Sequence, residues 1–284
     1  MQSLWMIVAS FLFACMGVCV KLAAVRYSPA EIVFYRSFIN LLCILLLVRL
    51  RDIPVRTPLW ALHVRRSVAG CMSLMLYFYA ISMLPLASAV TLAYTSPLFL
   101  AIYLALLGKV RLHRGMVFSL ILGFVGVVLL LRPTFDADQL FGGVVGLAGG
   151  MIAGLAYYNV KELGERGEVE ERTVFYFALV TTLASAGWMS FFEFRPVDRD
   201  GGTLLLGVGL FGTAAQLIMT RAYKRGNTLM SASLAYSTVI FASLFGMLFW
   251  QEKQTTEAWS AIALIVASGI VATWFSRANP AGQD

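Results

Sequence analysis

The stretch SVAGCMSLMLYFYAISMLPLASAVTLAYTSPLFLAIYLALLG, residues 67–108, contains no charged side chain in 42 positions. A helix that crosses a bilayer needs about 20 consecutive apolar residues. The stretch is therefore too long for one crossing and has the length of two. Proline lacks a backbone donor and disfavours helix in the residue before it, so Leu84-Pro85 predicts a tight turn between the two crossings.

Apolar runs of this kind fill the chain. Of its 284 residues, 60% are apolar and 13% are charged, whereas a soluble domain carries roughly 25% charged residues. The runs lie at 4–24, 32–49, 67–84, 87–107, 115–132, 143–161, 174–193, 203–222, 229–250 and 258–276. Because so few charges cannot cover a surface in water, the sequence predicts an all-α integral membrane protein with ten transmembrane helices. The first run lacks a basic leader and a cleavage site, so we expect it to be retained.

Three short segments recur at a nearly constant offset of about half the chain. Val33-Phe34-Tyr35 recurs as Val174-Phe175-Tyr176, Leu92-Ala93-Tyr94-Thr95 as Leu234-Ala235-Tyr236-Ser237, and Val20-Lys21 as Val160-Lys161, with offsets of 141, 142 and 140. An offset of five helices is odd, so the second half would lie upside down relative to the first. This predicts two inverted five-helix repeats, residues 1–135 and 141–277, followed by a cytoplasmic tail, residues 278–284. Such repeats are an architecture of secondary transporters.

The distribution of Lys and Arg predicts the orientation. With the N-terminus in the cytoplasm, the segments 49–66, 109–114, 161–172 and 221–225 together with Arg277 place 15 of the 22 basic residues inside. The positive-inside rule then favours a plasma (inner) membrane protein with both termini cytoplasmic. The net charge of +7 is explained by these loop clusters, which include Arg65 and Arg66, and we expect no binding to nucleic acid.

Several motifs resemble one transporter family. Pro29-Ala30-Glu31 leads into Phe34-Tyr35-Arg36, Leu84-Pro85-Leu86-Ala87 precedes Tyr94, and Gln251-Glu252-Lys253 precedes a final helix rich in small residues. With the two five-helix halves, these features resemble the EamA-type drug/metabolite transporters over the whole chain. The resemblance implies two bundles around a central cavity and transport of a small metabolite that is amino-acid-like, nucleotide-like or vitamin-like. We expect no cofactor or metal, and a protein that functions as a monomer in the lipid bilayer.

Arg36 is the charged residue that lies deepest in a predicted helix, about one turn inside its second run. Its guanidinium could bind a carboxylate or phosphate of the substrate bidentately. The alternative is a structural role, in which Arg36 extends toward the interface and pairs with Glu31.

Tyr94 and Tyr236 are repeat mates in polar segments, so we expect them to act as gates at opposite mouths of one pathway. Aromatic walls with a few hydrogen-bonding groups suit a small amphipathic ligand. Ordinary helix packing is the alternative for each residue. The candidate substrate-contacting residues are Arg36, Tyr79, Tyr94, Ser96, Tyr157, Tyr158, Asn159, Gln216, Tyr236 and Ser237.

The carboxylates, histidines, cysteines and glycines give weaker predictions about function. No carboxylate falls near the middle of a run, and only Glu31, Glu193 and Glu252, at helix ends, are left for proton coupling. We expect both histidines in cytoplasmic loops, and all four cysteines as buried apolar residues. Glycines spaced by four from Gly142 to Gly154 predict close helix packing, and Pro97 predicts a hinge. A membrane-embedded enzyme lacks a convergent set of catalytic groups here; a lipid-handling partner protein is the other alternative.

Overall fold

The computed structural model describes residues 2–108, 112–133, 139–189, 194–251 and 255–278, and this part of the chain is built from helices. A short 3-10 helix, η1 (Gln2–Leu4), leads into the first α-helix. The α-helices are α1 (Trp5–Ala23), α2 (Pro29–Leu50), α3 (Trp60–Met83), α4 (Leu86–Ala93), α5 (Ser96–Leu106), α6 (Arg114–Leu131), α7 (Leu140–Glu165), α8 (Glu170–Met189), α9 (Arg199–Arg225), α10 (Thr228–Ala235), α11 (Ser237–Trp250) and α12 (Thr256–Ala278).

Eight segments are long and apolar enough to cross a membrane. Two of them, 86–106 and 228–250, each combine a pair of shorter helices, α4 with α5 and α10 with α11. Helices α3 and α8 lie beside the others and are 24 and 20 residues long. They fall outside the eight because they carry more polar residues, such as Arg65 and Arg66 in α3 and Thr181 and Thr182 in α8.

Local sequence explains where several helices begin and end. The turn predicted at Leu84-Pro85 is confirmed, because α3 ends at Met83 and α4 begins at Leu86. Ser28 and Glu31 form a capping box that starts α2, since each side chain accepts a hydrogen bond from the other residue's backbone N–H. Asp198 caps α9 in a similar way by accepting a hydrogen bond from Gly201 N at 3.0 Å.

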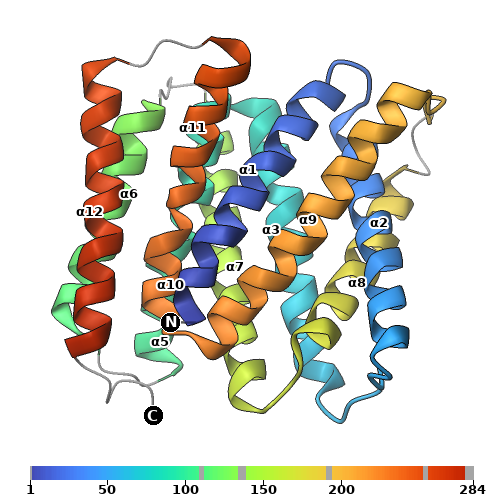
Figure 1. The fold of residues 1–284 in the computed structure, drawn as a ribbon, viewed down its shortest axis with the longest axis horizontal. Coiled ribbons are helices and arrows are strands. Elements are labelled where there is room, and N and C mark those ends of the chain that lie inside the picture. The colour runs from blue at the N-terminus through green and yellow to red at the C-terminus, as the bar shows by residue number, and fades with distance from the viewer. Residues whose placement is uncertain (1, 109–111, 134–138, 190–193, 252–254, 279–284) are drawn as a thin grey trace.

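The helices pack side by side in one bundle (Figure 1). Helix α3 packs against α7, α1 against α9, α2 against α8, and α6 against α12. Each of these contacts joins a helix from the first half of the chain to one from the second half. The two halves therefore share one interior.

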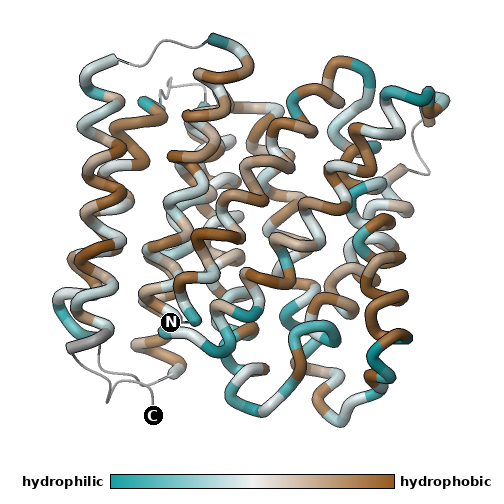
Figure 2. Tube along the Cα trace, in the orientation of Figure 1, coloured by the Kyte–Doolittle hydropathy of each residue, from teal (hydrophilic) through white to brown (hydrophobic). Residues whose placement is uncertain are grey.

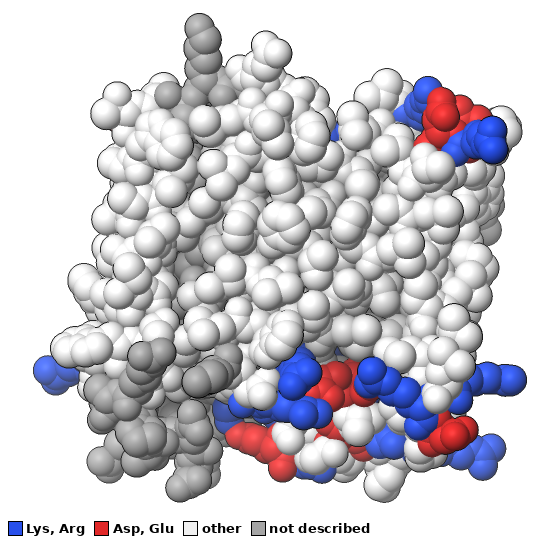
Figure 3. Space-filling view, viewed as in Figure 1, with Lys and Arg blue, Asp and Glu red and all other residues white. Residues whose placement is uncertain are grey.

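Charged side chains gather at the two ends of the bundle. In the face shown in Figure 3, Lys, Arg, Asp and Glu lie along the lower edge and at the upper right, and the band between them carries none. Figure 2 shows that the outer helices are largely hydrophobic in that band. This is the pattern of a protein that sits in a bilayer.

We call the lower end in Figure 1 the basic face, formed by residues 49–66, 161–172 and 221–225, and the other end the opposite face. Helix α1 begins and α12 ends at the basic face. The prediction that His63 and Arg66 lie in a loop at this face is wrong. Because α3 begins at Trp60, both are helical, and they are only 0% and 3% exposed.

Candidate functional site

A cavity of ≈ 370 Å³ lies inside the bundle, between the two halves of the chain. Helices α1 to α5 line it from the first half and α7 to α11 from the second. Its polar lining residues are Ser10, Arg36, Arg66, Ser73, Tyr77, Tyr94, Ser96, Tyr157, Gln216, Tyr223 and Thr238. A cavity of this size accommodates a small organic molecule.

Arg36 reaches the cavity from α2. The predicted alternative, a pair with Glu31, is absent among the described residues, because the Glu31 carboxylate is used elsewhere. Its two oxygens accept hydrogen bonds from Ser28 N at 2.8 Å and from Arg195 N at 2.7 Å. Glu31 therefore serves as a cap and a loop anchor, and Arg36 faces the cavity without it.

Arg66 reaches the same cavity from α3 and is 3% exposed. Its guanidinium lies 4.1 Å above the ring of Phe177, and its Nε and Nη1 have no hydrogen-bond partner in the described part of the chain. A cation on an aromatic face gains roughly 0.5–2 kcal/mol. Because removal of an ion from water costs several kcal/mol even after relaxation, Phe177 offsets only part of that cost.

The sequence held a signal for Arg66 that a count of basic residues overlooks. Arg66, Gly70, Ser73 and Tyr77 are spaced by four, three and four residues, and this spacing places them on one face of a helix. All four line the cavity. The periodicity therefore marks a polar helix face that continues from Arg66 into an uncharged run.

Two glycines let these side chains approach neighbouring helices closely. A Cβ atom at Gly70 would lie 2.9 Å from Phe177 Cε2 and 3.2 Å from Arg66 Nη1. A Cβ atom at Gly212 would lie 3.0 Å from Met16 Sδ and 3.4 Å from Arg36 Nε. The positions differ by 142 residues, the offset of the sequence repeats, and Arg36 and Phe177 differ by 141. Related positions in the two halves thus bring α2 onto α9 and α8 onto α3.

Each of the apolar spans 86–106 and 228–250 is broken at a tyrosine. Helix α4 ends before Tyr94 and α5 begins at Ser96, next to Pro97; α10 ends before Tyr236 and α11 follows it. The rings of Tyr94 and Tyr236 are 6.1 Å apart, centroid to centroid. The expectation that they guard opposite mouths is therefore wrong in this conformation, because both breaks meet at one place within the bundle.

The glycine stripe of α7 packs against the break between α4 and α5. A Cβ atom at Gly150 would lie 2.5 Å from Leu92 O, and one at Gly154 would lie 3.0 Å from Ser96 O. The backbones of these helices are in near contact, as the spacing of four predicted. The Leu92 carbonyl at the break thus faces α7 across a space that only glycine leaves open.

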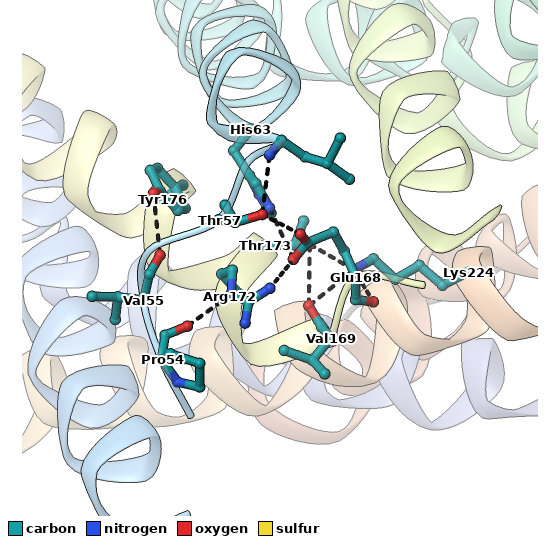
Figure 4. Close-up of polar contacts among 11 residues, drawn as sticks. Pro54, Val55, Thr57, His63, Glu168, Val169, Arg172, Thr173, Tyr176 and Lys224 are labelled. Atoms are coloured by element: carbon teal, nitrogen blue, oxygen red, sulfur yellow. Dashed lines mark hydrogen bonds and ion pairs between the residues drawn. The ribbon is translucent and has the colours of Figure 1, made fainter. Parts of the chain in front are cut away.

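A polar network around Glu168 joins α3, α8, α9 and the segment before α3 (Figure 4). His63 is one turn before Arg66 in α3, and Lys224 follows the cavity-lining Tyr223 in α9. Both approach Glu168, in the segment between α7 and α8. His63 Nε2 lies 3.3 Å from Glu168 Oε2, and Lys224 Nζ donates to Glu168 O and Val169 O at 3.0 Å and to Thr173 Oγ1 at 2.6 Å.

The Glu168 carboxylate is the centre of this network. It accepts hydrogen bonds from Arg172 Nη1 at 2.5 Å and from the Thr57 hydroxyl. Burial raises the pKa of Glu168, but the hydrogen bonds from Thr57, Arg172 and His63 outweigh burial and hold the pKa below its ordinary value. Glu168 is thus held as a carboxylate that joins α3, α8 and the segment before α3.

Comparison with known proteins decides the family. The model of the EamA-like transporter family matches residues 1–132 and 140–274. The chain belongs to this family. The pseudopaline exporter CntI of Pseudomonas aeruginosa is 33% identical over 266 residues, covering 93% of this chain and 90% of that protein. A riboflavin transporter of Brucella anthropi is 22% identical over 272 residues, covering 93% and 95%. A solved crystal structure superposes with a TM-score of 0.86 at 22% identity, covering 97% of this chain and 98% of the other, which supports the fold alone.

Family membership makes the chain a multi-pass membrane protein of a transporter family, and the relatives' names point to transport of small molecules rather than to enzymatic catalysis. Among the described residues, no three of His, Cys, Asp and Glu lie close enough to hold a metal ion. Glu193 and Glu252, two of the acids considered for proton coupling, lie outside the described residues, as does most of the predicted tail, residues 279–284.

Half of the ten candidate site residues line the cavity of this EamA-like transporter. These are Arg36, Tyr94, Ser96, Tyr157 and Gln216. The other five, Tyr79, Tyr158, Asn159, Tyr236 and Ser237, are not among its lining residues, and their contact with substrate stays a prediction. Tyr79 is 50% exposed, whereas Asn159 and Tyr236 are fully buried. The cavity is also lined by residues that were not predicted from the sequence: Ser10, Arg66, Ser73, Tyr77, Phe177, Tyr223 and Thr238.

A second cavity, of ≈ 590 Å³, lies on the outside of the bundle between α1, α10, α11 and α12. Apolar side chains such as Ile7, Phe241 and Trp274 dominate its lining, with Ser233, Ser237 and Thr273 as the polar exceptions. Because Trp274 is 64% exposed, this cavity opens toward the surroundings of the bundle, where lipid chains would lie.

Proposed function

We propose that the protein is a secondary transporter that moves a small organic metabolite across the plasma (inner) membrane by alternating access. Ten crossings would form two inverted five-helix repeats, residues 1–135 and 141–277, with α4–α5 and α10–α11 each counted as one broken crossing. Relatives named for export of pseudopaline and for transport of riboflavin support a substrate of metabolite size. One chain supplies all the described lining residues, in keeping with a monomer.

The helix contacts support the repeat. If α1 corresponds to α7, α2 to α8, α3 to α9 and α6 to α12, the contact of α3 with α7 corresponds to that of α9 with α1. The contact of α5 with α7 likewise corresponds to that of α11 with α1, and the contacts of α2 with α8 and α6 with α12 map onto themselves. This is the contact pattern of a pseudo-twofold arrangement.

The observation that carries the proposal is the position of the cavity. It lies at the interface of the two halves, and both contribute side chains to it. We infer that the network around Glu168, which joins the two halves near the basic face, closes that end of the cavity. If the halves rock about this cavity, the network opens and the cavity faces the basic face. The excess of Lys and Arg at the basic face supports its placement, and that of both termini, in the cytoplasm.

Alternating access can be tested with one cysteine in the cavity. Ala153→Cys would be made in a protein whose Cys15, Cys19, Cys43 and Cys71 are alanine, because Ala153 lines the cavity from α7. An impermeant maleimide should label it from either side of the membrane, in right-side-out and in inverted vesicles. Leu183→Cys, at a site 65% exposed on the bundle surface, serves as the control and should resist the reagent from both sides because lipid covers it.

The closing network gives a second arm of this test. Glu168→Gln should raise labelling of Ala153→Cys from the basic face and lower it from the other side, since it removes contacts made only when that end is closed. Labelling from one side alone, unchanged by Glu168→Gln, would mean a fixed cavity and would sink the proposed mechanism.

A lipid-handling role is the second candidate, and the outer cavity between α1 and α12 favours it. Ile270→Trp would fill that cavity from α12. If lipid handling is the function, this variant should lose lipid that co-purifies with the protein, measured by native mass spectrometry. Ile270→Trp should also impair the protein's function, whereas maleimide labelling of Ala153→Cys should stay normal. A lipid-handling role would leave the guanidinium groups of the inner cavity without a function. For this reason we favour transport.

A further inference from the structure

Arg36 and Arg66 together give the inner cavity a specific chemistry. Building on the proposed transport function, we propose that the substrate is a small organic anion with two acidic groups, carboxylate or phosphate, and that Arg66 and Arg36 each bind one of them. Neither the family nor the named relatives assign this site. Three observations support the proposal: the charge of the cavity, the unpartnered donors that face it, and the acidic partners that nearby arginines have and Arg66 lacks among the described residues.

The cavity is cationic. Of the described residues that line it, two are charged and both are arginines, with no aspartate or glutamate among them. Arg66 enters from the helix end nearer the basic face, and Arg36 from the end nearer the opposite face. Tyr157 of α7 lines the same cavity and is near enough to both guanidinium groups to interact electrostatically with each.

The donors around this region lack partners. Arg66 Nε and Nη1 are unpartnered among the described residues, and so are Gln216 Nε2 and Ser10 Oγ. Gln216 and Ser10 are 4% and 1% exposed, and both line the cavity. Guanidinium donors are arranged as a planar fork that matches the oxygens of a carboxylate or a phosphate. The unsatisfied groups therefore call for an acceptor-rich, anionic ligand.

Other arginines near the cavity form ion pairs with glutamates of the same chain. Arg65, next to Arg66, pairs with Glu162; Arg172 pairs with Glu168. Arg66 is more buried than either and has no acidic partner among the described residues. A buried cation without a counter-ion persists when a ligand provides the opposite charge. Arg36, which is only partly buried, lines the same cavity, so two acidic groups on the ligand would neutralise the two arginines. The volume of ≈ 370 Å³ restricts the ligand to a small molecule.

Binding can be tested on the purified full-length protein by thermal unfolding. The probes are succinate, citrate, glutamate and glycerol 3-phosphate, with succinamide and glycerol as uncharged counterparts and putrescine as a dication, all at one ionic strength. We expect the acids to raise the unfolding temperature, because a ligand that binds only the folded state stabilises it. Succinate and citrate should act at lower concentration than glutamate, whose ammonium group reduces its negative charge, and than glycerol 3-phosphate, which has one acidic group. The uncharged and cationic probes should have no effect.

Variants locate the site. Arg66→Gln should weaken binding of the best acid by about tenfold or more, as should Arg36→Gln, and the double variant should abolish the response. Arg66→Lys, which keeps the charge and loses the fork, should fall between wild type and Arg66→Gln. Arg65→Gln is the matched control, one position away and paired outside the cavity, and it should respond like wild type. In the absence of ligand, Arg66→Gln should unfold at a higher temperature than wild type, because it removes an unpaired charge.

The proposal is overturned if succinamide or putrescine stabilises the protein as well as the acids do, if no acid does so, or if Arg66→Gln and Arg36→Gln respond like Arg65→Gln. These outcomes leave the transport mechanism standing, because labelling of Ala153→Cys from both sides does not depend on ligand charge. Loss of two-sided labelling with the acid response intact would instead indicate an anion-binding protein that does not transport.

Discussion

Arg66 is buried and Arg172 is partly buried near the basic face, and their surroundings differ. Arg172 has a side chain 15% exposed; it donates to the Glu168 carboxylate at 2.5 Å and to Pro54 O at 2.9 Å. Arg66 is 3% exposed and rests on Phe177 with two nitrogens unpartnered among the described residues. The comparison separates a region stabilised by its own acids from a region that leaves its charge for a ligand.

The largest loss of stability should come from removing the acid of the Glu168 network, so that its basic residues lack a counter-ion, as Arg66 does among the described residues. Glu168→Gln keeps the shape of the side chain but removes the charge that Arg172 and His63 face, so the network contains cations without an acid. Breaking a buried ion pair by removing one partner costs about 3–5 kcal/mol. We expect a loss of that size in the free energy of unfolding, measured by denaturant or thermal unfolding of the purified protein.

Glu165→Gln is the control for this variant. Glu165 lies three positions earlier and is 57% exposed, in an i,i+4 pair with Lys161. Its loss should change stability by about 0.5 kcal/mol or less. Equal effects of the two substitutions would mean that the network around Glu168 is not a buried unit, and the contrast with Arg66 would lose its basis.

Lowering the pH should neutralise Glu168 reversibly and should therefore cause a similar but smaller loss of stability. The folded pKa of Glu168 lies below its ordinary value of 4.5, so its contribution is fully present above about pH 4.5 and is lost as the pH falls through the folded pKa. The stability advantage of wild type over Glu168→Gln should therefore be constant from pH 7 to 5 and shrink below pH 4.5. His63, Arg172, Thr57 and Lys224 face the same carboxylate, so the pH dependence of the difference reports Glu168 together with the groups coupled to it. An advantage that grows on acidification would contradict this assignment.

Substitutions at Gly70 and Gly212 can displace the cavity arginines, because an added Cβ atom would lie next to Arg66 or Arg36. In Gly70→Ala, the added methyl group meets the stiff ring of Phe177 at 2.9 Å and Arg66 Nη1 at 3.2 Å. Overpacking of this kind costs about 1–3 kcal/mol. Gly212→Ala meets the flexible Met16 side chain at 3.0 Å and should cost less.

The two glycine variants should also differ in ligand response. Gly70→Ala displaces the Phe177 ring from Arg66 and should weaken stabilisation by the acids, measured by thermal shift. Gly212→Ala leaves the Arg66 guanidinium in place and should retain most of the response. If both variants bind acids like wild type, the position of Arg66 on Phe177 is not important for binding.

The sequence predicted the helical class, the turn at Leu84-Pro85 and five of the eleven polar lining residues, because hydrophobic runs, proline and aromatic-polar clusters are local signals. It did not predict how deeply a side chain is buried or which groups it contacts. Arg66 was counted with its neighbour Arg65 as a loop residue, although the packing of α3 against α7 and α8 buries Arg66. Tyr94 and Tyr236 were expected at opposite mouths because they are repeat mates in halves of opposite orientation. The breaks beside them bring the two rings together instead.

The smallest effect should come from Glu162, which tests whether pairing or burial sets the stability difference. Glu162 resembles Glu168 closely: it lies six positions earlier and also faces two basic side chains, Arg65 and Arg166. Its partners are 54% and 50% exposed, however, whereas His63 and Arg172 are 0% and 15% exposed. Water can solvate the exposed arginines after the acid is removed, so Glu162→Gln should change the free energy of unfolding by about 0–1 kcal/mol. The same measurement that follows Glu168→Gln suffices. A loss as large as that of Glu168→Gln would show that the number of ionic partners, rather than burial, sets the energy. The unpaired Arg66 would then no longer be exceptional, and the argument that it waits for an acidic ligand would weaken with it.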